Sequence, residues 1–136
     1  MPYTIQKTIL IIDDDESLRN LLQIILETAD IQTIRAANAG EALTALHDHS
    51  KSIQGVLLDL NLNQLKSEDF YDVIVAIDPG IAIFPMSGCI TEEIEERFAG
   101  KAIAGIITKP FSPASLMETI TEGFARKPNE NIPKVV

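Results

Sequence analysis

Residues 9–17 read ILIIDDDES, a run of four aliphatic side chains followed at once by three adjacent aspartates. An uninterrupted aliphatic run of this length is typical of a strand that is buried on both faces of a parallel sheet. Carboxylates this close repel one another, and burying them removes favourable hydration. The stretch therefore predicts a buried strand whose end carries an acidic site that requires a positive charge.

The same alternation continues along the chain, where short apolar runs are separated by segments in which apolar residues recur every three or four positions. The predicted strands cover residues 8–12, 31–35, 53–58, 81–86 and 103–107. The helices between and after them are predicted to bury Leu18, Leu21, Leu22 and Ile25; Ala39, Ala42, Leu43 and Leu46; Phe70, Val73, Ile74 and Ile77; Ile94 and Phe98; and Leu116, Ile120 and Phe124. Strands that alternate with helices in this way form α/β proteins, in which helices cover both faces of a parallel sheet. We therefore predict a doubly wound α/β fold of five strand–helix units.

Several of the predicted helices have recognisable start signals. Asp15 is predicted to be the N-cap of the first helix. Asn38 and Glu41 have the spacing of a capping box. Ser112 precedes Pro113 as an N-cap precedes the first helical residue. These signals place helix starts directly after the first, second and fifth strands.

Length, charge and cysteine content narrow the class of protein. The chain has 136 residues, a formal net charge of −9 and one cysteine. The length fits one domain, which we assign to residues 1–126, with the aperiodic residues 127–136 as a tail or linker. An acidic surface disfavours nucleic acid and anionic membranes and suits a basic protein or a divalent cation. One cysteine allows no internal disulfide, and no signal peptide or membrane span is recognisable, so we predict a cytoplasmic protein.

Polar residues close most of the predicted strands. Asp13 and Asp14 end the first strand, Asp59 the third, Ser87 the fourth and Lys109 the fifth. In open α/β sheets, ligands bind beyond the carboxyl ends of the strands, so these side chains are expected to share one site. Carboxylates gathered there require a cation, and hard oxygen ligands suit Mg²⁺. Asp59 would then stay ionised and could attack a phosphoryl group.

Four motifs in this order resemble the receiver domain of two-component response regulators. They are IIDDDESLRNLL at residues 11–22, VLLDLN at 56–61, MSG at 86–88 and TKPF at 108–111. The likeness extends over residues 7–126, nearly the whole chain. It implies a flavodoxin-like sheet with strand order 2-1-3-4-5 and a signalling domain that accepts phosphoryl groups and is not an enzyme acting on other substrates.

The resemblance also implies a role for each strand-end residue. Asp59 would be the phosphoacceptor. Asp14 would bind Mg²⁺ directly, Asp13 mainly through water, and the backbone carbonyl of Asn61 would be the third protein ligand. The phosphoryl donor would be a histidine kinase or a histidine phosphotransfer protein. The output partner would bind the surface formed by the fourth helix, fifth strand and fifth helix.

Further positions are implied to hold the phosphoryl group or to tune its lifetime. Ser87 and Lys109 would contact phosphoryl oxygens, and Gly88 would leave room for the group to enter. Asn61 and Cys89 occupy the two variable positions that set the lifetime of the aspartyl phosphate in such domains.

The chain departs from the family pattern at three places. Ile106 stands three residues before the lysine, where receivers usually have an aromatic residue that couples to the site. The loop LNQLKS lacks the usual proline and glycine, so Asn63 and Ser67 are expected to give it a different shape. Pro85 lies in a strand predicted to be central, which removes a ladder hydrogen bond or marks a bulge.

Two other readings of these residues stay open at the level of sequence. The pattern Asp13-x-Asp15-x-Ser17 resembles the nucleophile loop of haloacid-dehalogenase-type phosphatases, in which Asp13 would be the nucleophile. That interpretation lacks a later acidic pair and leaves Asp59 without a role. The other alternative is a receiver-like interaction module that is never phosphorylated. A dinucleotide-binding fold is disfavoured, because no glycine-rich loop follows the first strand.

Overall fold

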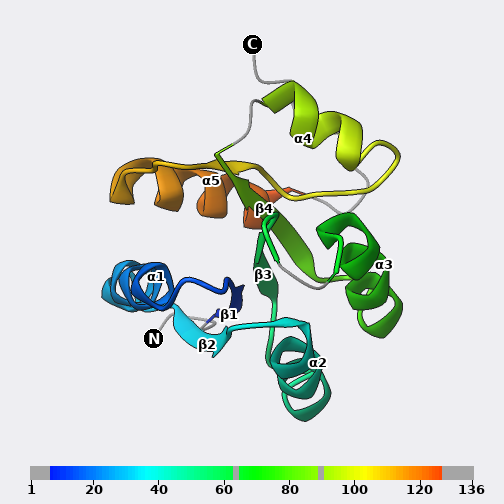
Figure 1. The fold of residues 1–136 in the computed structure, drawn as a ribbon. Helices are drawn as coiled ribbons and strands as arrows, with labels where there is room; N and C mark the ends of the chain where they lie inside the picture. The colour runs from blue at the N-terminus through cyan, green and yellow to red at the C-terminus, as the bar shows by residue number, and fades with distance from the viewer. Residues whose placement is uncertain (1–6, 63–64, 89–90, 127–136) are drawn as a thin grey trace.

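The computed structural model describes residues 7–62, 65–88 and 91–126. Within these ranges strands and helices alternate strictly along the chain (Figure 1). The elements are β1 (Thr8–Ile12), α1 (Glu16–Thr28), β2 (Gln32–Ala36), α2 (Ala39–Asp48), β3 (Gly55–Asp59), α3 (Ser67–Ile77), β4 (Ala82–Ser87), α4 (Thr91–Arg97), β5 (Ile107–Thr108) and α5 (Pro113–Ala125). The predicted order of five strand–helix units is confirmed.

The strands form one parallel sheet in the order β2-β1-β3-β4-β5. Helices α1 and α5 cover one face of the sheet, and α2 and α3 cover the other (Figure 1). This is the doubly wound arrangement that the sequence predicts. Its strand order also agrees with the order that the family resemblance implies.

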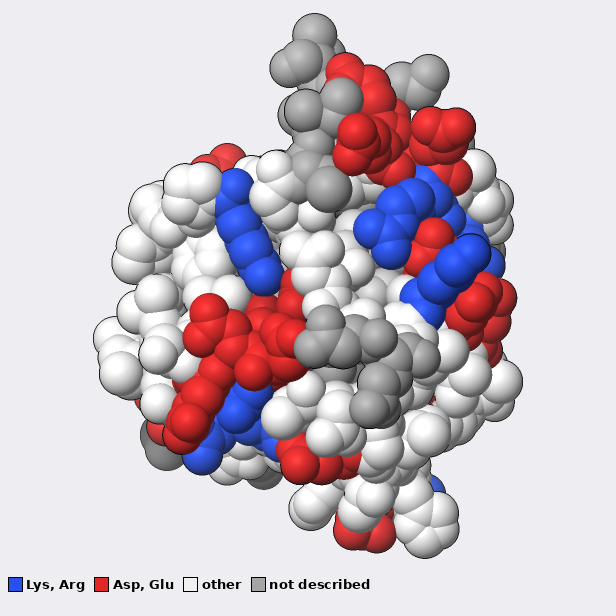
Figure 2. Space-filling view, viewed as in Figure 1, with Lys and Arg blue, Asp and Glu red and all other residues white. Residues whose placement is uncertain are grey.

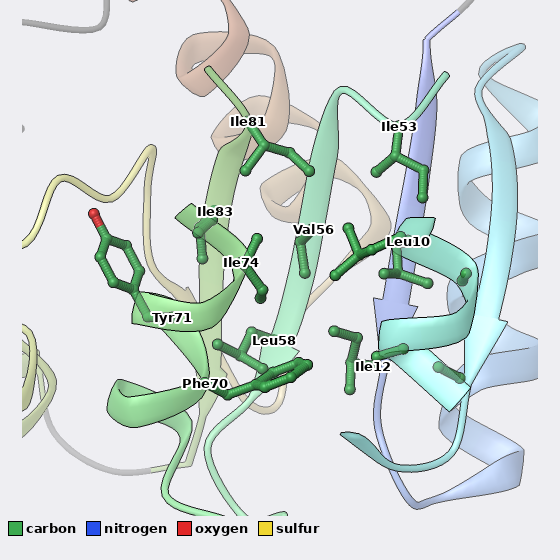
Figure 3. Packing of buried hydrophobic residues seen from close by; sticks show 14 of the residues in the cluster. Leu10, Ile12, Ile53, Val56, Leu58, Phe70, Tyr71, Ile74, Ile81 and Ile83 are labelled. Atoms are coloured by element: carbon green, nitrogen blue, oxygen red, sulfur yellow. The ribbon is translucent and has the colours of Figure 1, made fainter. Parts of the chain in front are cut away.

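The two central strands β1 and β3 are buried along their whole length. Successive side chains of a strand point to opposite faces of the sheet, so each face receives half of them. Leu10 and Ile12 pack with α2 and α3 in the cluster shown in Figure 3. Ile9 and Ile11 pack on the other face with α1 and α5. Burial on both faces explains why these strands are uninterrupted apolar runs and do not alternate with polar residues.

Asp15 and Asn38 cap their helices as predicted, but one bond of the predicted capping box has a different partner. The side chain of Asp15 accepts a hydrogen bond from the Leu18 backbone N–H at 3.2 Å. Asn38 likewise accepts from the Glu41 backbone N–H at 2.9 Å. The Glu41 carboxylate, however, accepts from the Ala37 N–H and not from Asn38, so the return bond of the predicted capping box lies one residue earlier.

The buried stripe of three helices differs from the prediction. Four residues predicted to be buried are large and exposed: Leu21 (47 %), Leu43 (39 %), Val73 (40 %) and Ile77 (43 %). Leu26, Ala45 and Tyr71 are buried on the same helices. Each of these helices lies on one face of the sheet, so its buried stripe is narrower than its apolar stripe. Periodicity alone does not decide which edge of that stripe faces the core.

β5 is shorter than predicted, because the ladder covers only Ile107–Thr108 and not residues 103–107. The carbonyls of Ile83 and Ser87 both accept hydrogen bonds from the β5 side of the sheet, each at 2.8 Å. Pro85 lies between these two residues and faces the same side, since strand residues alternate between neighbours. Proline has no N–H to donate there, which explains why pairing narrows to the end of the strand. The register of β4 with β3 is continuous, so no bulge forms.

In residues 7–62, 65–88 and 91–126, none of the helices has both the length and the apolar character needed to cross a bilayer.

Candidate functional site

The carboxyl edge of the sheet brings together side chains from three neighbouring strands. Asp13 directly follows β1, Asp59 ends β3 and Ser87 ends β4. All three are buried, with relative exposures of 1 %, 2 % and 0 %. Because the strands are parallel, their ends meet at the same edge, as the sequence predicts.

Three carboxylates form a cluster at this edge. One carboxylate oxygen from each of Asp13, Asp14 and Asp59 lies within 4.8 Å of the other two. Asp14 is exposed, whereas Asp13 and Asp59 are buried beneath it. Figure 2 shows acidic side chains gathered over β1 and the start of α1, with basic side chains at the margin of the group. The cluster is therefore open to solvent on the side of Asp14.

Lys109 bridges the two buried carboxylates. Its Nζ lies 3.2 Å from Asp13 Oδ2 and 3.2 Å from Asp59 Oδ1. The lysine side chain is 23 % exposed, so both ion pairs are largely removed from water. The predicted proximity of these three residues is confirmed, and the ammonium group lies where it can neutralise the site.

The crowding of charged groups shifts the pKa values of Asp13 and Lys109. Burial raises the pKa of Asp13, and the charge of Asp59 raises it further, against hydrogen bonds from the Asp15 N–H and Lys109 that lower it. Burial lowers the pKa of Lys109, but the charges and hydrogen bonds of Asp59 and Asp13 together outweigh burial and raise it. Lys109 is therefore held in the charged state, and Asp13 carries an electrostatic cost that a further cation would relieve.

Two contacts that the sequence did not indicate hold the backbone around the carboxylates. Arg19, on the first turns of α1, donates from Nη1 to the backbone carbonyl of Asp13 at 2.6 Å. Ser67, the first residue of α3, donates from Oγ to the backbone carbonyl of Asp59 at 2.7 Å. Arg19 follows the predicted N-cap Asp15 by one helical turn, and this spacing could have indicated a positive charge close to the aspartates.

The loop after β3 also contacts the Asp59 carboxylate. The Asn61 backbone N–H donates to Asp59 Oδ1 at 3.1 Å. This bond turns the loop back over the strand end and places the Asn61 peptide next to the acidic cluster. Asn63 lies outside the described residues.

The donor set fits Mg²⁺. All three side chains offer hard carboxylate oxygens, which this ion prefers. Lys109 contributes a single positive charge against the three carboxylates of Asp13, Asp14 and Asp59. Asp14 is exposed, so the open side of the cluster can supply the water ligands that Mg²⁺ usually keeps. Asp13, Asp14 and Asp59 would hold the ion.

The positions expected to tune the site are only partly described. Gly88 is exposed directly after the buried Ser87, and Cys89 lies outside the described residues. Ile106 is half-buried and packs against the core cluster on the α2 and α3 side of the sheet. It has no polar atom on its side chain, so it cannot form a hydrogen-bonded link to the site.

Restoring an aromatic residue at position 106 should not alter phosphoryl chemistry. We expect Ile106→Tyr to leave Mg²⁺ binding and labelling by a small phosphoryl donor unchanged, because Ile106 contacts the apolar cluster and lies outside the group of carboxylates. Calorimetric Mg²⁺ titration and intact-mass labelling would check this. Loss of Mg²⁺ binding in this variant would contradict the placement of Ile106 outside the site.

Comparison with known proteins identifies relatives that match most of the chain. A sequence model of the response regulator receiver domain matches residues 9–121. The chain is 28 % identical over 116 residues to the chemotaxis protein CheY of Halobacterium salinarum, covering 85 % of this chain and 95 % of that protein. It is 30 % identical over 128 residues to the DNA-binding response regulator MtrA of Mycobacterium tuberculosis, covering 93 % of this chain and 54 % of MtrA. The chain thus spans about half the length of MtrA.

A solved structure shows the same architecture. The CheY-like response regulator receiver domain protein of Methanospirillum hungatei superposes with a TM-score of 0.77 at 26 % sequence identity. The superposition covers 86 % of this chain and 92 % of that protein. The strand order and helix placement described above are therefore shared with a solved relative over nearly its full length.

Proposed function

The chain belongs to the response regulator receiver domain family, whose sequence model matches residues 9–121, and we propose that Asp59 is its phosphoacceptor. Receiver domains are signalling phosphoacceptors and not classical enzymes. The observation that supports Asp59 is its position at the end of a central strand, where it is 2 % exposed, paired with Lys109 and grouped with Asp13 and Asp14.

The proposed reaction is transfer from a phosphohistidine of a histidine kinase or phosphotransfer protein. An Asp59 carboxylate oxygen attacks phosphorus while the bond from phosphorus to the histidine nitrogen breaks. If the other ring nitrogen of the donor carries a proton, neutral imidazole leaves and Asp59 becomes an acyl phosphate. Such transfer depends mainly on positioning and on neutralising charge.

The residues around Asp59 would position the phosphoryl group and neutralise its charge. Lys109 already lies 3.2 Å from the attacking carboxylate and would pair with a phosphoryl oxygen as the group arrives. Ser87, buried at the end of β4, would donate its hydroxyl to a second oxygen. Mg²⁺, when bound, would neutralise carboxylate and phosphoryl charge. The Asn61 carbonyl would complete its protein ligands.

Signal output would follow from a shift between two conformations of the domain. We propose that residues 1–126 form the receiver domain, that 127–136 are a tail or linker, and that the partner binds the α4, β5 and α5 face. The exposed glutamates of α4 form an acidic group on that face (Figure 2). A partner with a basic surface would fit it, whereas nucleic acid and anionic membranes would not. The proposed location is the cytoplasm.

Intact mass after incubation with acetyl phosphate and Mg²⁺ tests this function. We expect one added phosphoryl group, lost when Mg²⁺ is chelated and lost in Asp59→Asn. Labelling that survives in Asp59→Asn and disappears in Asp13→Asn would support the phosphatase alternative instead. Against that alternative, the Asp15 carboxylate caps α1. Absence of both labelling and Mg²⁺ binding would leave the unphosphorylated interaction module.

A further inference from the structure

Ser67 is a buried hydroxyl in contact with the proposed phosphoacceptor. It is the first residue of α3 and has a relative exposure of 0 %. Its Oγ donates to the backbone carbonyl of Asp59 at 2.7 Å, across eight residues of chain. A buried polar side chain aimed at one backbone group of the site has a specific structural task.

The Asp59 carbonyl needs this partner because of where β3 ends. The Leu60 N–H donates to the Met86 carbonyl at 3.0 Å, so Leu60 faces β4. Strand residues alternate between neighbours, and Asp59 therefore faces β1. The ladder between β1 and β3 ends one residue earlier, at the pair Ile12 and Leu58. Among the residues that the structure describes, the β1–β3 ladder does not continue past this pair, and the Ser67 hydroxyl bonds the Asp59 carbonyl instead.

Three bonds from different elements then fix Asp59. Ser67 holds its backbone carbonyl, while the Asn61 N–H and Lys109 Nζ both reach Oδ1 of its carboxylate, at 3.1 Å and 3.2 Å. Rotation about the Cα–C bond of Asp59 would turn its carbonyl and move the Asn61 peptide relative to the Asp59 carboxylate. The bond from Ser67 opposes that rotation, because α3 itself is packed on the core through Phe70.

We propose that Ser67 is a positioning residue for phosphoryl transfer, which aims the Asp59 carboxylate and the Asn61 peptide by holding the peptide unit between them. The inference rests on the proposed function of Asp59. Phosphoryl transfer tolerates little misplacement of the attacking oxygen, so loosening this peptide slows the reaction even where Mg²⁺ is saturating.

The test compares Ser67→Ala with Tyr71→Phe, a matched control on the same helix. The Tyr71 hydroxyl also donates to a backbone carbonyl, that of Ala102, at the same distance of 2.7 Å, but it does not contact the site. Ser67→Ala is expected to slow labelling by acetyl phosphate about tenfold at saturating Mg²⁺. Amide hydrogen exchange at Asn61 should accelerate in the metal-free protein. Tyr71→Phe should lower thermal stability while leaving both readouts unchanged.

The possible outcomes distinguish the proposed function of Asp59 from the positioning role of Ser67. Absence of labelling in the wild-type protein would overturn the proposed function itself. Wild-type labelling with an unchanged rate and unchanged Asn61 exchange in Ser67→Ala would overturn the positioning role alone. An equal slowing in Tyr71→Phe would show a general effect of stability and would also overturn it. If Ser67→Ala does not fold, Ser67→Cys keeps a similar size but replaces the hydroxyl by a much weaker donor, so slower labelling is expected. Labelling of Ser67→Cys as fast as wild type would refute the role.

Discussion

Lys109→Met is expected to slow phosphorylation of Asp59 by about 100- to 1,000-fold, the cost of removing one preorganised donor from a site where charge develops. Its Nζ lies 3.2 Å from the Asp59 carboxylate, so an arriving phosphoryl oxygen would meet this charge. The same variant should bind Mg²⁺ more tightly, because the lysine and the ion compete for Asp13 and Asp59. Labelling rates at saturating Mg²⁺ and calorimetric titration would measure the two effects, which have opposite signs.

The stability of Lys109→Met should depend on the metal. Breaking a fully buried ion pair costs about 3–5 kcal/mol, and the 23 % exposure of this lysine reduces the expected loss to about 1–3 kcal/mol in the presence of a chelator. Mg²⁺ should restore most of it. Lys101→Met is a suitable control, since it removes the same charge from the surface pair with Asp72. Weaker Mg²⁺ binding in Lys109→Met would contradict the competition between lysine and metal.

The grouping of Asp13, Asp59 and Lys109 could be predicted without a structure. Asp13 and Asp59 directly follow uninterrupted apolar runs, and Lys109 follows the apolar stretch 103–107 after one threonine. Such runs are typical of buried parallel strands, whose carboxyl ends share one edge. The sheet order adds that β1 and β3 are neighbours, which brings the two aspartates to the same lysine. The sequence pattern was sufficient here, because the residues that end the strands are also the residues that form the site.

Contacts that depend on tertiary geometry could not be predicted in this way. Ser67 begins α3, but nothing in its sequence neighbours shows that its hydroxyl reaches the Asp59 carbonyl. The short β5 follows from Pro85 on a different strand, so residues 103–107 contain no sign of it. Leu21 and Leu43 fit a core stripe by spacing, yet both are exposed, because spacing does not decide which edge of the stripe faces the sheet.

The Ser67 contact and the exposure of Leu21 and Leu43 both depend on how much of a side chain the fold buries. Burial also affects the charge state of the site. Asp13 and Asp59 are almost fully buried, whereas Asp14 and Asp15, adjacent in sequence to Asp13, are exposed. Three consecutive aspartates therefore have different electrostatic environments. Substituting them one at a time should separate metal binding from helix capping and from stability.

Asp13→Asn should weaken Mg²⁺ binding by at least about 100-fold, the upper end of the loss seen when a supporting group is removed. In a chelator the same variant should be more stable than wild type by about 1–2 kcal/mol, because a buried charge with a raised pKa is replaced by a neutral group of the same shape. For a chain of this length, this corresponds to a rise in Tm of about 3–8 °C.

The stability gain of Asp13→Asn should depend on pH in a defined direction. The pKa of Asp13 in the folded protein is raised above 3.8, its value in an unfolded chain, so the folded state binds this proton more tightly. The wild-type protein therefore loses stability as pH rises through the raised pKa. The advantage of the variant should be complete above that pKa and absent below 3.8. Thermal unfolding in a chelator at pH 7 and at acidic pH would measure it.

Asp15→Asn is the matched control for Asp13→Asn, since it removes the same charge two residues away. Asparagine caps helices as well as aspartate, so the bond to the Leu18 N–H should persist and stability should change little. Mg²⁺ binding should also persist, because Asp15 lies outside the carboxylate cluster. Equal loss of Mg²⁺ affinity in both variants would mean that the ion responds to the overall charge of the loop and that Asp13 is not a specific metal-binding residue.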